Sequence, residues 1–540
     1  MTTTEAGPAG DDAAAVKDAT AAQSWRPSAE HAIGALWFMI VFGSITWVWE
    51  LNPRALPSPD EALNRFAAQV IADTWRPFLQ LPFADPEDLA HPRHWVSVGD
   101  RALPSYAPVT IYLYALFLKL HRFGFVLITA LPASGIGAFA AGIAGLLPGR
   151  RKWLALVTPL LAFPALYWAM RPLMNLSLLL ACIGWAFFAW SAWLTERRPQ
   201  QLTAAVLCVG AAAAVRPDYA AYLMLVTLLF GLSQALEQWR RVVVLVLIAG
   251  GSAVALNLFL NWLVTGHPTV AAYQIVAARD EGPSQSGGVL GLLRQLLIPM
   301  GIPEPRMAAS FVSRYWLEMG PIAGLTLSQL LLLRHFLKKP RLPQLLFGLA
   351  IFVMVCFVLS RMDRDLNGAQ EHFGQVHHSM PRYWSPVYLL ATLTPVLFLG
   401  RSRRRSVFGI GSALLVALAL TSGYEIYRRE RYSQTTLRLY GERATRTLRS
   451  LQRRIPKGAM VYSGVYDKLL WPYWRVGTVS EPEPSATSIA RAAKVGLPLF
   501  VFDPSLRGRQ LRALERALHR CRLDLENAGE PGLYRVVAEP

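Results

Sequence analysis

Long apolar segments separated by short basic clusters run through most of this chain. The first apolar segment extends from Ala32 to Trp49, and a polar stretch from Glu50 to Arg101 follows it. Further apolar segments lie near residues 104–120, 123–147, 153–170, 173–194, 202–215, 219–236, 242–264, 316–333, 345–360, 385–400 and 407–421. A membrane-spanning helix needs about 20 residues, with about 17 tolerated, so the shortest segments need their flanking residues or a thinner bilayer. The pattern predicts an all-α polytopic membrane protein with about 11 to 13 transmembrane helices.

The N-terminal segment differs from a cleaved secretory signal. Residues 1–31 are rich in Ala, Thr and Asp without periodicity, which predicts a disordered cytoplasmic tail. The apolar segment after it ends in Trp47–Pro53, where a signal peptide would carry small residues at a cleavage site. We therefore interpret 32–49 as an uncleaved first transmembrane helix.

The basic clusters predict the orientation. Lys and Arg concentrate in cytoplasmic loops, so we expect these clusters to face the cytoplasm: Arg150–Lys152, Arg197–Arg198, Arg240–Arg241, Lys338–Arg341 and Arg401–Arg405. Following the chain from them predicts these outer segments: 50–103, 265–315, 361–382 and 422–540. The N-terminus is then cytoplasmic, and the C-terminal segment extracytoplasmic.

One apolar segment conflicts with this orientation. Lys119–Arg122 and Arg150–Lys152 both have the character of cytoplasmic clusters, yet only 123–147 separates them. Either Pro132–Gly135 breaks that segment into a re-entrant pair of half-helices, or one cluster departs from a statistical rule.

Composition supports a membrane protein. Of 540 residues, 53% are hydrophobic and only 16% are charged, against about 25% charged in soluble domains. This excludes a disordered chain, a small disulfide scaffold and an ordinary soluble enzyme. The 54 Lys and Arg against 35 Asp and Glu give a net charge of +19, but they lie mainly between apolar segments, so we expect no nucleic-acid partner. The four cysteines form no CxxC pair, which argues against a thiolate metal site.

The C-terminal segment has a different pattern. Residues 459–463, 497–502 and 533–537 have the pattern of short strands, and Leu511–Leu523 has helical spacing. We therefore predict three parts: a tail over 1–31, a transmembrane domain over 32–425 with outer loop 50–103, and a small extracytoplasmic α/β domain over 426–540.

Two adjacent carboxylates follow the first predicted helix. Pro57-Ser-Pro precedes Asp60 and Glu61, and carboxylates at a membrane exit can act as a general base or bind a cation. The alternative is that Ser58 or Asp60 caps the helix that follows.

The same outer loop ends in a second candidate segment. Asp100 and Tyr106 precede Pro108 and an apolar run, and proline suits the first turn of a helix. Tyr106, Tyr112 and Tyr114 also fit an interfacial aromatic belt.

Candidate anion-binding residues lie near the end of the transmembrane part. His372, His377, His378 and Arg382 precede Tyr383 and a helix. Arginine offers a fork of donors that matches phosphate, and histidine can add hydrogen bonds. A metal site formed by the histidines is a weaker alternative, because their spacing matches no standard pattern. The simplest alternative is that Arg382 and Tyr383 only reach toward the membrane interface, with no ligand.

Two arginines interrupt apolar segments. They are Arg171, in Arg171-Pro172, and Arg216, in Arg216-Pro-Asp218. A charged side chain is costly at membrane depth, so we expect each arginine either to anchor the structure or to form part of a site. Arg216 could pair locally with Asp218, whereas Arg171 has no acid nearby in the sequence.

These features together resemble the GT-C superfamily of membrane glycosyltransferases. The closest resemblance is to the bacterial branch related to protein O-mannosyltransferases and the lipid A aminoarabinose transferase. The segments that carry it are Pro57–Glu61, Gly99–Pro108, Arg216–Tyr219, Asn261–Tyr273 and Pro381–Pro386. The family often has paired prolines before its second helix, whereas this chain has Tyr106-Ala-Pro108, so the resemblance leaves the acceptor and the subfamily open.

The resemblance implies transfer of a sugar from a polyprenyl-phosphate donor to an acceptor hydroxyl on the outer face of the bacterial cytoplasmic membrane. By carry-over, Asp60 is the expected general base, with Glu61 beside it. The expected donor phosphate residues are Arg382, His377, His378, Tyr383, Arg216 and Arg171. The expected acceptor or substrate loop residues are Asp100, Tyr106 and Tyr273.

The expected partners are the lipid-linked donor, membrane lipids, and an envelope glycan, lipid or protein acceptor. We expect no required cofactor, with a divalent metal left open. The main alternative is a transporter or flippase of lipid-linked sugars, against which stand the absence of repeats, the long outer loop and the added outer domain. A non-catalytic partner in envelope glycan assembly is a third interpretation.

Overall fold

A computed structural model describes most of the chain at residue level. The described residues are 28–49, 59–83, 89–92, 95–98, 100–104, 108–120, 122–234, 236–269, 385, 389, 392–428, 433–464, 466–471, 473–479, 481–504, 506 and 508–539. The predicted apolar segments 316–333 and 345–360, and nearly all of the predicted tail, lie outside them.

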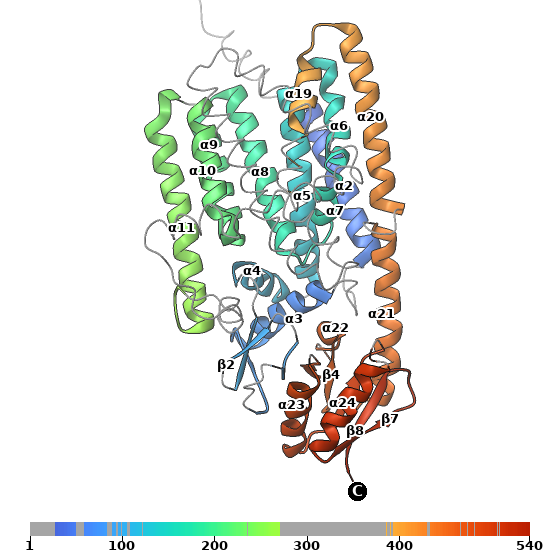
Figure 1. Ribbon diagram of the computed structural model, residues 1–540. Coiled ribbons are helices and arrows are strands. Elements are labelled where there is room, and N and C mark those ends of the chain that lie inside the picture. Colours follow the sequence, from blue (N-terminus) through green and yellow to red (C-terminus); the bar gives the residue numbers. More distant parts are fainter. Residues whose placement is uncertain are drawn as a thin grey trace, which may run out of the picture.

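Apolar helices form the larger part of the molecule. Within the described ranges, five are long and apolar enough to cross a membrane: α2 (Ala29–Trp49), α5 (Arg122–Leu146), α8 (Asn175–Glu196), α11 (Trp239–Thr265) and α20 (Arg405–Arg428). The shorter apolar helices α9 (Pro199–Val215) and α10 (Pro217–Gln234) stand beside them, and α4 (Pro108–Leu118) lies at their lower end in Figure 1. The arrangement is that of a multi-pass membrane protein, and the total number of spans stays a prediction.

Two predicted segments fold differently from expectation. Segment 123–147 is one continuous helix, α5, which contains Pro132, so the re-entrant interpretation is wrong. Neighbouring helices and local adjustment allow a proline inside a membrane helix. Segment 153–170 is not one helix but two, α6 (Leu154–Leu161) and α7 (Phe163–Ala169), which meet at Ala162.

Close contacts between small residues join the central helices. A Cβ added at Gly184 of α8 would lie 2.0 Å from the carbonyl oxygen of Gly135 in α5, and one at Gly137 would lie 2.6 Å from that of Gly34 in α2. Apolar packing gives little net driving force within a bilayer, so such backbone approaches are a main source of helix association there. The glycines of α5 therefore hold α2 and α8 on its two sides.

The basic clusters lie at both ends of the helices. Arg151 of the short helix η1 (Gly149–Trp153) donates to the carbonyl oxygens of Gly400 and Ser402 at 3.0 and 2.7 Å, and Lys152 pairs with Glu30. Gly400 belongs to α19 (Leu393–Arg401). Near α4, by contrast, the Lys119 ammonium lies 4.0 Å from the Trp75 ring that follows α3. One continuous helix thus separates the Lys119–Arg122 and Arg150–Lys152 clusters, and both the cluster that departs from the rule and the end that is cytoplasmic stay predictions.

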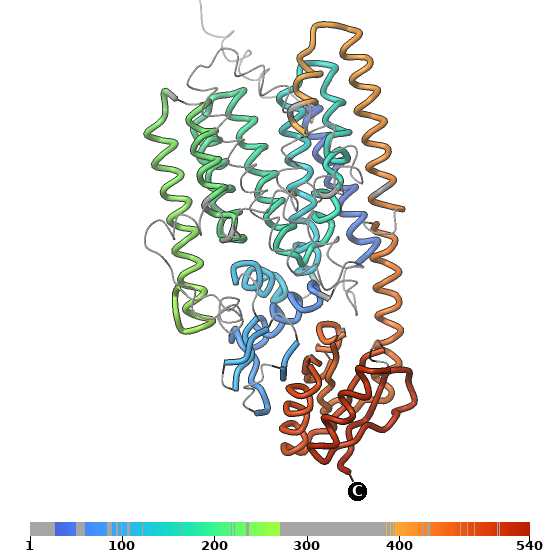
Figure 2. Tube along the Cα trace, viewed as in Figure 1, coloured from blue at the N-terminus to red at the C-terminus, as the bar shows by residue number. Residues whose placement is uncertain are grey.

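The segment predicted as the outer loop forms a small folded layer. It contains helix α3 (Pro59–Thr74) and strands β1 (Leu79–Gln80), β2 (Trp95–Val98) and β3 (Arg101–Pro104), which make an antiparallel sheet in the order β1-β3-β2. Figure 2 shows this layer in blue beneath the helices, at the same end as the red C-terminal segment.

The C-terminal segment is an α/β unit. Five strands pair in the order β5-β4-β6-β8-β7: β4 (Met460–Ser463), β5 (Arg475–Thr478), β6 (Leu499–Phe502), β7 (Leu523–Asn527) and β8 (Leu533–Ala538). β4, β5 and β6 are parallel, whereas β8 runs antiparallel to β6 and β7. The helices are α21 (Gln434–Arg454), α22 (Asp467–Leu470), α23 (Pro482–Lys494) and α24 (Arg509–Arg520).

The three strands predicted in this segment are β4, β6 and β8, whereas β5 and β7 were not predicted. The predicted helix 511–523 ends earlier, because Leu523 already begins β7. Helix α20 continues to Arg428, past the predicted boundary at 425.

Candidate functional site

Helix α3 places the two candidate carboxylates at the start of its first turn. The helix begins at Pro59, a favourable first residue because its missing N–H leaves no helical bond unmade. Asp60 is therefore inside the first turn and not at the capping position before it, whereas Ser58, the other capping candidate, lies outside the described residues. Acidic side chains in this turn interact favourably with the helix dipole.

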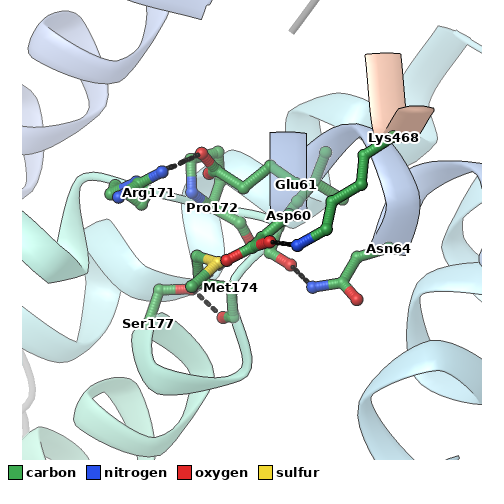
Figure 3. Close-up of polar contacts among 9 residues, drawn as sticks. Asp60, Glu61, Asn64, Arg171, Pro172, Met174, Ser177 and Lys468 are labelled. Carbon is green, nitrogen blue, oxygen red and sulfur yellow. Dashed lines mark hydrogen bonds and ion pairs between the residues drawn. The ribbon is translucent and has the colours of Figure 1, made fainter. Parts of the chain in front are cut away.

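Glu61 is buried and paired with a cation from a distant segment. Its Oε2 lies 3.2 Å from both Nε and Nη2 of Arg171, and its side chain is completely buried. Arg171 follows α7, and its guanidinium also stacks 4.6 Å from the centre of the Trp168 ring. The acid that Arg171 lacks in the local sequence is thus supplied by α3, as Figure 3 shows.

The segment that carries Arg171 is held by hydrogen bonds to its backbone. Asn64 of α3 donates to the carbonyl of Leu173 at 2.8 Å, and Tyr114 of α4 donates to that of Pro172 at 2.6 Å. The Ser177 hydroxyl donates to the carbonyl of Met174 at 2.6 Å. Tyr114 is buried in this network, so it is not a residue of an interfacial belt.

The surroundings of Glu61 change its acidity. Burial raises the pKa of Glu61 to about 7, and the positive charge of Arg171 limits the rise. Burial disfavours the charged form of a carboxyl group, whereas a neighbouring cation favours it. Glu61 therefore titrates in the neutral range, while it is closed off from solvent.

Asp60 pairs with a lysine from the C-terminal α/β unit. Lys468 of α22 donates to Asp60 Oδ1 at 2.5 Å, across 408 positions of sequence. The Lys468 side chain is 8% exposed, whereas that of Asp60 is 28% exposed. The two neighbouring carboxylates thus differ: Glu61 faces the interior, and Asp60 keeps access to solvent.

Aromatic packing fixes the α/β unit beside α3. Trp471, directly after α22, packs against both Phe66 of α3 and Trp95 of β2, and its ring centre lies 5.5 Å from that of each. Two hydrogen bonds add to this contact: Thr478 of β5 donates its backbone N–H to Leu89 and its hydroxyl to His91, both at 2.7 Å. The position of Lys468 therefore does not depend on its ion pair alone.

The other predicted site residues with described positions lie at two places. Arg216 is buried at the end of α9, where it donates to Asn175 Oδ1 at 3.2 Å and stacks on Tyr219; its proposed partner Asp218 has its side chain outside the described part. Asp100 is exposed between β2 and β3, where it accepts a hydrogen bond from Gln80 at 2.6 Å.

The remaining predicted residues lie outside the described part of the chain: Tyr106, Tyr273, His377, His378, Arg382 and Tyr383. Within the described part, no group of three His, Cys, Asp or Glu side chains has a geometry that could hold a metal ion.

Sequence reasoning missed Lys468 and Asn64. Lys468 lies in the four-residue helix α22 between β4 and β5, and only its contact with Asp60 distinguishes it from an ordinary solvated lysine. Asn64 lies one turn after Asp60 on the same helix face, which was a usable signal.

Comparisons with known proteins give one set of structural neighbours. No family model and no curated protein matches the chain. Two crystal structures of ArnT from Cupriavidus metallidurans are similar to it, one bound to undecaprenyl phosphate and one in the apo state. Each shares 13% sequence identity with a TM-score of 0.45, and the match covers 94% of this chain and 98% or 97% of the ArnT chain.

ArnT is the lipid A aminoarabinose transferase, a GT-C enzyme. This is the branch of membrane glycosyltransferases that the sequence resembles, and membership of it stays a prediction for this chain. The comparison assigns no role to any residue of this chain.

Proposed function

We propose that this chain is a membrane glycosyltransferase that moves a sugar from a polyprenyl-phosphate donor to an acceptor hydroxyl, with Asp60 as general base. The observation that carries the proposal is the unequal pair at the start of α3, in which one carboxylate is accessible and the other is buried. The pair lies where the helices, the outer loop and the α/β unit meet.

The difference in exposure divides the roles of the two acids. A general base must come within about 3 Å of the proton that it removes, so it needs a surface that the acceptor can reach. Asp60 has that access, and both the N-terminus of α3 and the Lys468 ammonium place positive charge beside it. Glu61 has no such access, so it positions Arg171 and the 171–174 segment against α3.

The proposed reaction is one displacement at the anomeric carbon. The acceptor oxygen forms a bond to that carbon while the bond from the carbon to the phosphate oxygen breaks. The bonding electron pair leaves with polyprenyl phosphate, and the acceptor proton passes to Asp60. Cations near the phosphate stabilise the charge that develops on the leaving group.

The donor phosphate residues proposed from the sequence remain Arg382, His377, His378 and Tyr383, with Arg216 and Arg171. Arg171 already contacts Glu61 through two nitrogens, so it would have to weaken that contact to bind a phosphate. Arg382 is therefore a stronger candidate for the phosphate than Arg171. Asp100, Tyr106 and Tyr273 remain the proposed acceptor side.

A product assay tests the proposed function. Purified protein is incubated with a panel of polyprenyl-phosphate sugars and candidate acceptors, and the release of polyprenyl phosphate and the glycosylated product are measured. In parallel, the same protein in vesicles is tested for movement of the intact donor across the bilayer. Equal release of polyprenyl phosphate and product supports the transferase, whereas movement of intact donor without product supports the transporter alternative.

A further inference from the structure

If Asp60 is the general base, its protonation removes the negative charge that balances the Lys468 ammonium. The Lys468 ammonium is almost fully buried, and it lies 2.5 Å from the Asp60 carboxylate. A buried cation without a partner is costly. When Asp60 accepts the proton of the acceptor, it becomes neutral and Lys468 loses that counter-charge. A second anion must then take its place, and the reaction generates one on the leaving phosphate.

Lys468 is better suited to change partner than Arg171 is. Two nitrogens of Arg171 contact Glu61, and its plane stacks on Trp168, so moving it disrupts several contacts at once. Lys468 carries a compact ammonium with three donors on a flexible four-carbon stem. It also pairs with Asp60, the more exposed of the two carboxylates, and Figure 3 shows this pair.

The surroundings of Lys468 support a ligand-binding position. In sheets of parallel strands, ligands bind beyond the carboxyl ends of the strands, where the chain order reverses. β4 lies between β5 and β6 in the parallel part of the sheet, and α22 follows its carboxyl end. That end of the sheet contacts the outer loop through Thr478 and α3 through Trp471.

We propose that Lys468 is a donor phosphate ligand supplied by the C-terminal α/β unit. Its ammonium pairs with Asp60 in the ligand-free protein, and it moves to the phosphate when a polyprenyl-phosphate donor binds. This inference rests on the proposed function and deepens it. The exchange releases the Asp60 carboxylate from Lys468 and places a positive charge beside the leaving group, so one residue couples donor binding to activation of the base.

The test uses binding, because binding can be measured without turnover. The full-length protein in lipid nanodiscs is titrated with a polyprenyl monophosphate and, separately, with the corresponding polyprenol, which lacks the phosphate. The variants are Lys468→Met, Lys468→Arg and Asp60→Asn. Lys494→Met at the exposed end of α23 is the control, and the melting temperature of each variant reports folding. Trp471 and Thr478 hold the α/β unit in place, so these variants are expected to fold.

The two partners of the ion pair should change phosphate binding in opposite directions. Lys468→Met should weaken binding of the polyprenyl monophosphate by about tenfold, the usual effect of losing one charge-assisted contact, while polyprenol binding stays the same. Lys468→Arg should retain most of the affinity. Asp60→Asn should strengthen phosphate binding several-fold, because Lys468 no longer has to leave a carboxylate.

Other outcomes overturn the inference. Unchanged phosphate binding in Lys468→Met would leave the proposed function intact but remove Lys468 from the donor site. Parallel losses in Lys468→Met and Asp60→Asn would show that the pair only supports the structure. A wild-type protein that binds the phosphate but transfers no sugar from any donor would refute the proposed function and not the phosphate site, whereas failure to bind the phosphate at all would refute both.

Discussion

At the scale of single residues, burial separates two acids that adjoin in the sequence. Glu61 is enclosed with Arg171, and Asp60 stays partly exposed beside Lys468. A carboxylate that is fully removed from water favours its protonated form unless a cation compensates. The pair therefore offers one group for structural support and one for proton transfer.

The pKa of Glu61 predicts how stability depends on pH. Because the folded protein raises this pKa from 4.5 to about 7, the stability associated with the group is fully present below pH 4.5 and is lost as the pH rises through 7. Glu61→Gln removes this titration, and it also removes the counter-charge of the buried Arg171. The melting temperature of the variant minus that of the wild type should therefore increase from pH 5 to pH 8, whatever its value at pH 5. Melting temperatures measured from pH 5 to 8 check this, and a difference that stays constant or falls with pH would contradict it.

Sequence analysis found the site residues that a local pattern reveals, and it missed the one that only a long-range contact reveals. Asp60 and Glu61 were recognisable because charge is rare in this chain and stands out beside an apolar segment. Lys468 was not, because its importance comes only from a contact with a residue 408 positions away. Whether Asp60 or Glu61 is accessible was also not predictable, since both lie in the same turn.

At the scale of elements, close glycine contacts define how α5 packs. Gly135 and Gly184 bring the backbones of α5 and α8 together, whereas a Cβ added at Gly145 of α5 would meet open space. Long apolar helices were predictable from length and hydropathy alone. The break between α6 and α7 and the strands β5 and β7 were not, because four or five mixed residues carry too little periodicity.

This packing predicts a contrast between two identical substitutions. Gly184→Ala should lower the free energy of unfolding by about 1–3 kcal/mol, since its Cβ would lie 2.0 Å from a backbone oxygen. Gly145→Ala should leave stability unchanged or raise it slightly, because alanine favours a helix. Thermal unfolding of both variants in one detergent measures the difference, and equal effects would argue against the α5–α8 contact.

At the scale of the whole molecule, the α/β unit and the predicted outer loop share one end of the helical part, opposite the end where α19 lies (Figure 1). The sequence predicted this arrangement through the basic clusters, although Lys119–Arg122 lies at the other end. It could not predict how the α/β unit docks, since aromatic contacts such as that of Trp471 leave no local pattern.

Labelling from the two sides of the membrane tests the orientation. In a cysteine-free background, a cysteine at Arg404 should react only with reagent on the cytoplasmic side, and one at Arg509 only on the outer side. Both positions are exposed, so access to water is not limiting. Labelling of Arg509→Cys from the cytoplasmic side would contradict the proposed topology and place the site on the wrong face.

The most direct test of the central claim is the rate of sugar transfer by Asp60→Asn at saturating donor. Asparagine keeps the size of the side chain but cannot accept the proton, so the rate should fall by roughly 10² to 10⁴, as is usual when a general base is lost. Asp73→Asn, at an exposed position on the same helix, is the matched control and should keep full activity. A folded Asp60→Asn protein that transfers sugar at the wild-type rate would contradict the assignment of Asp60 as the base.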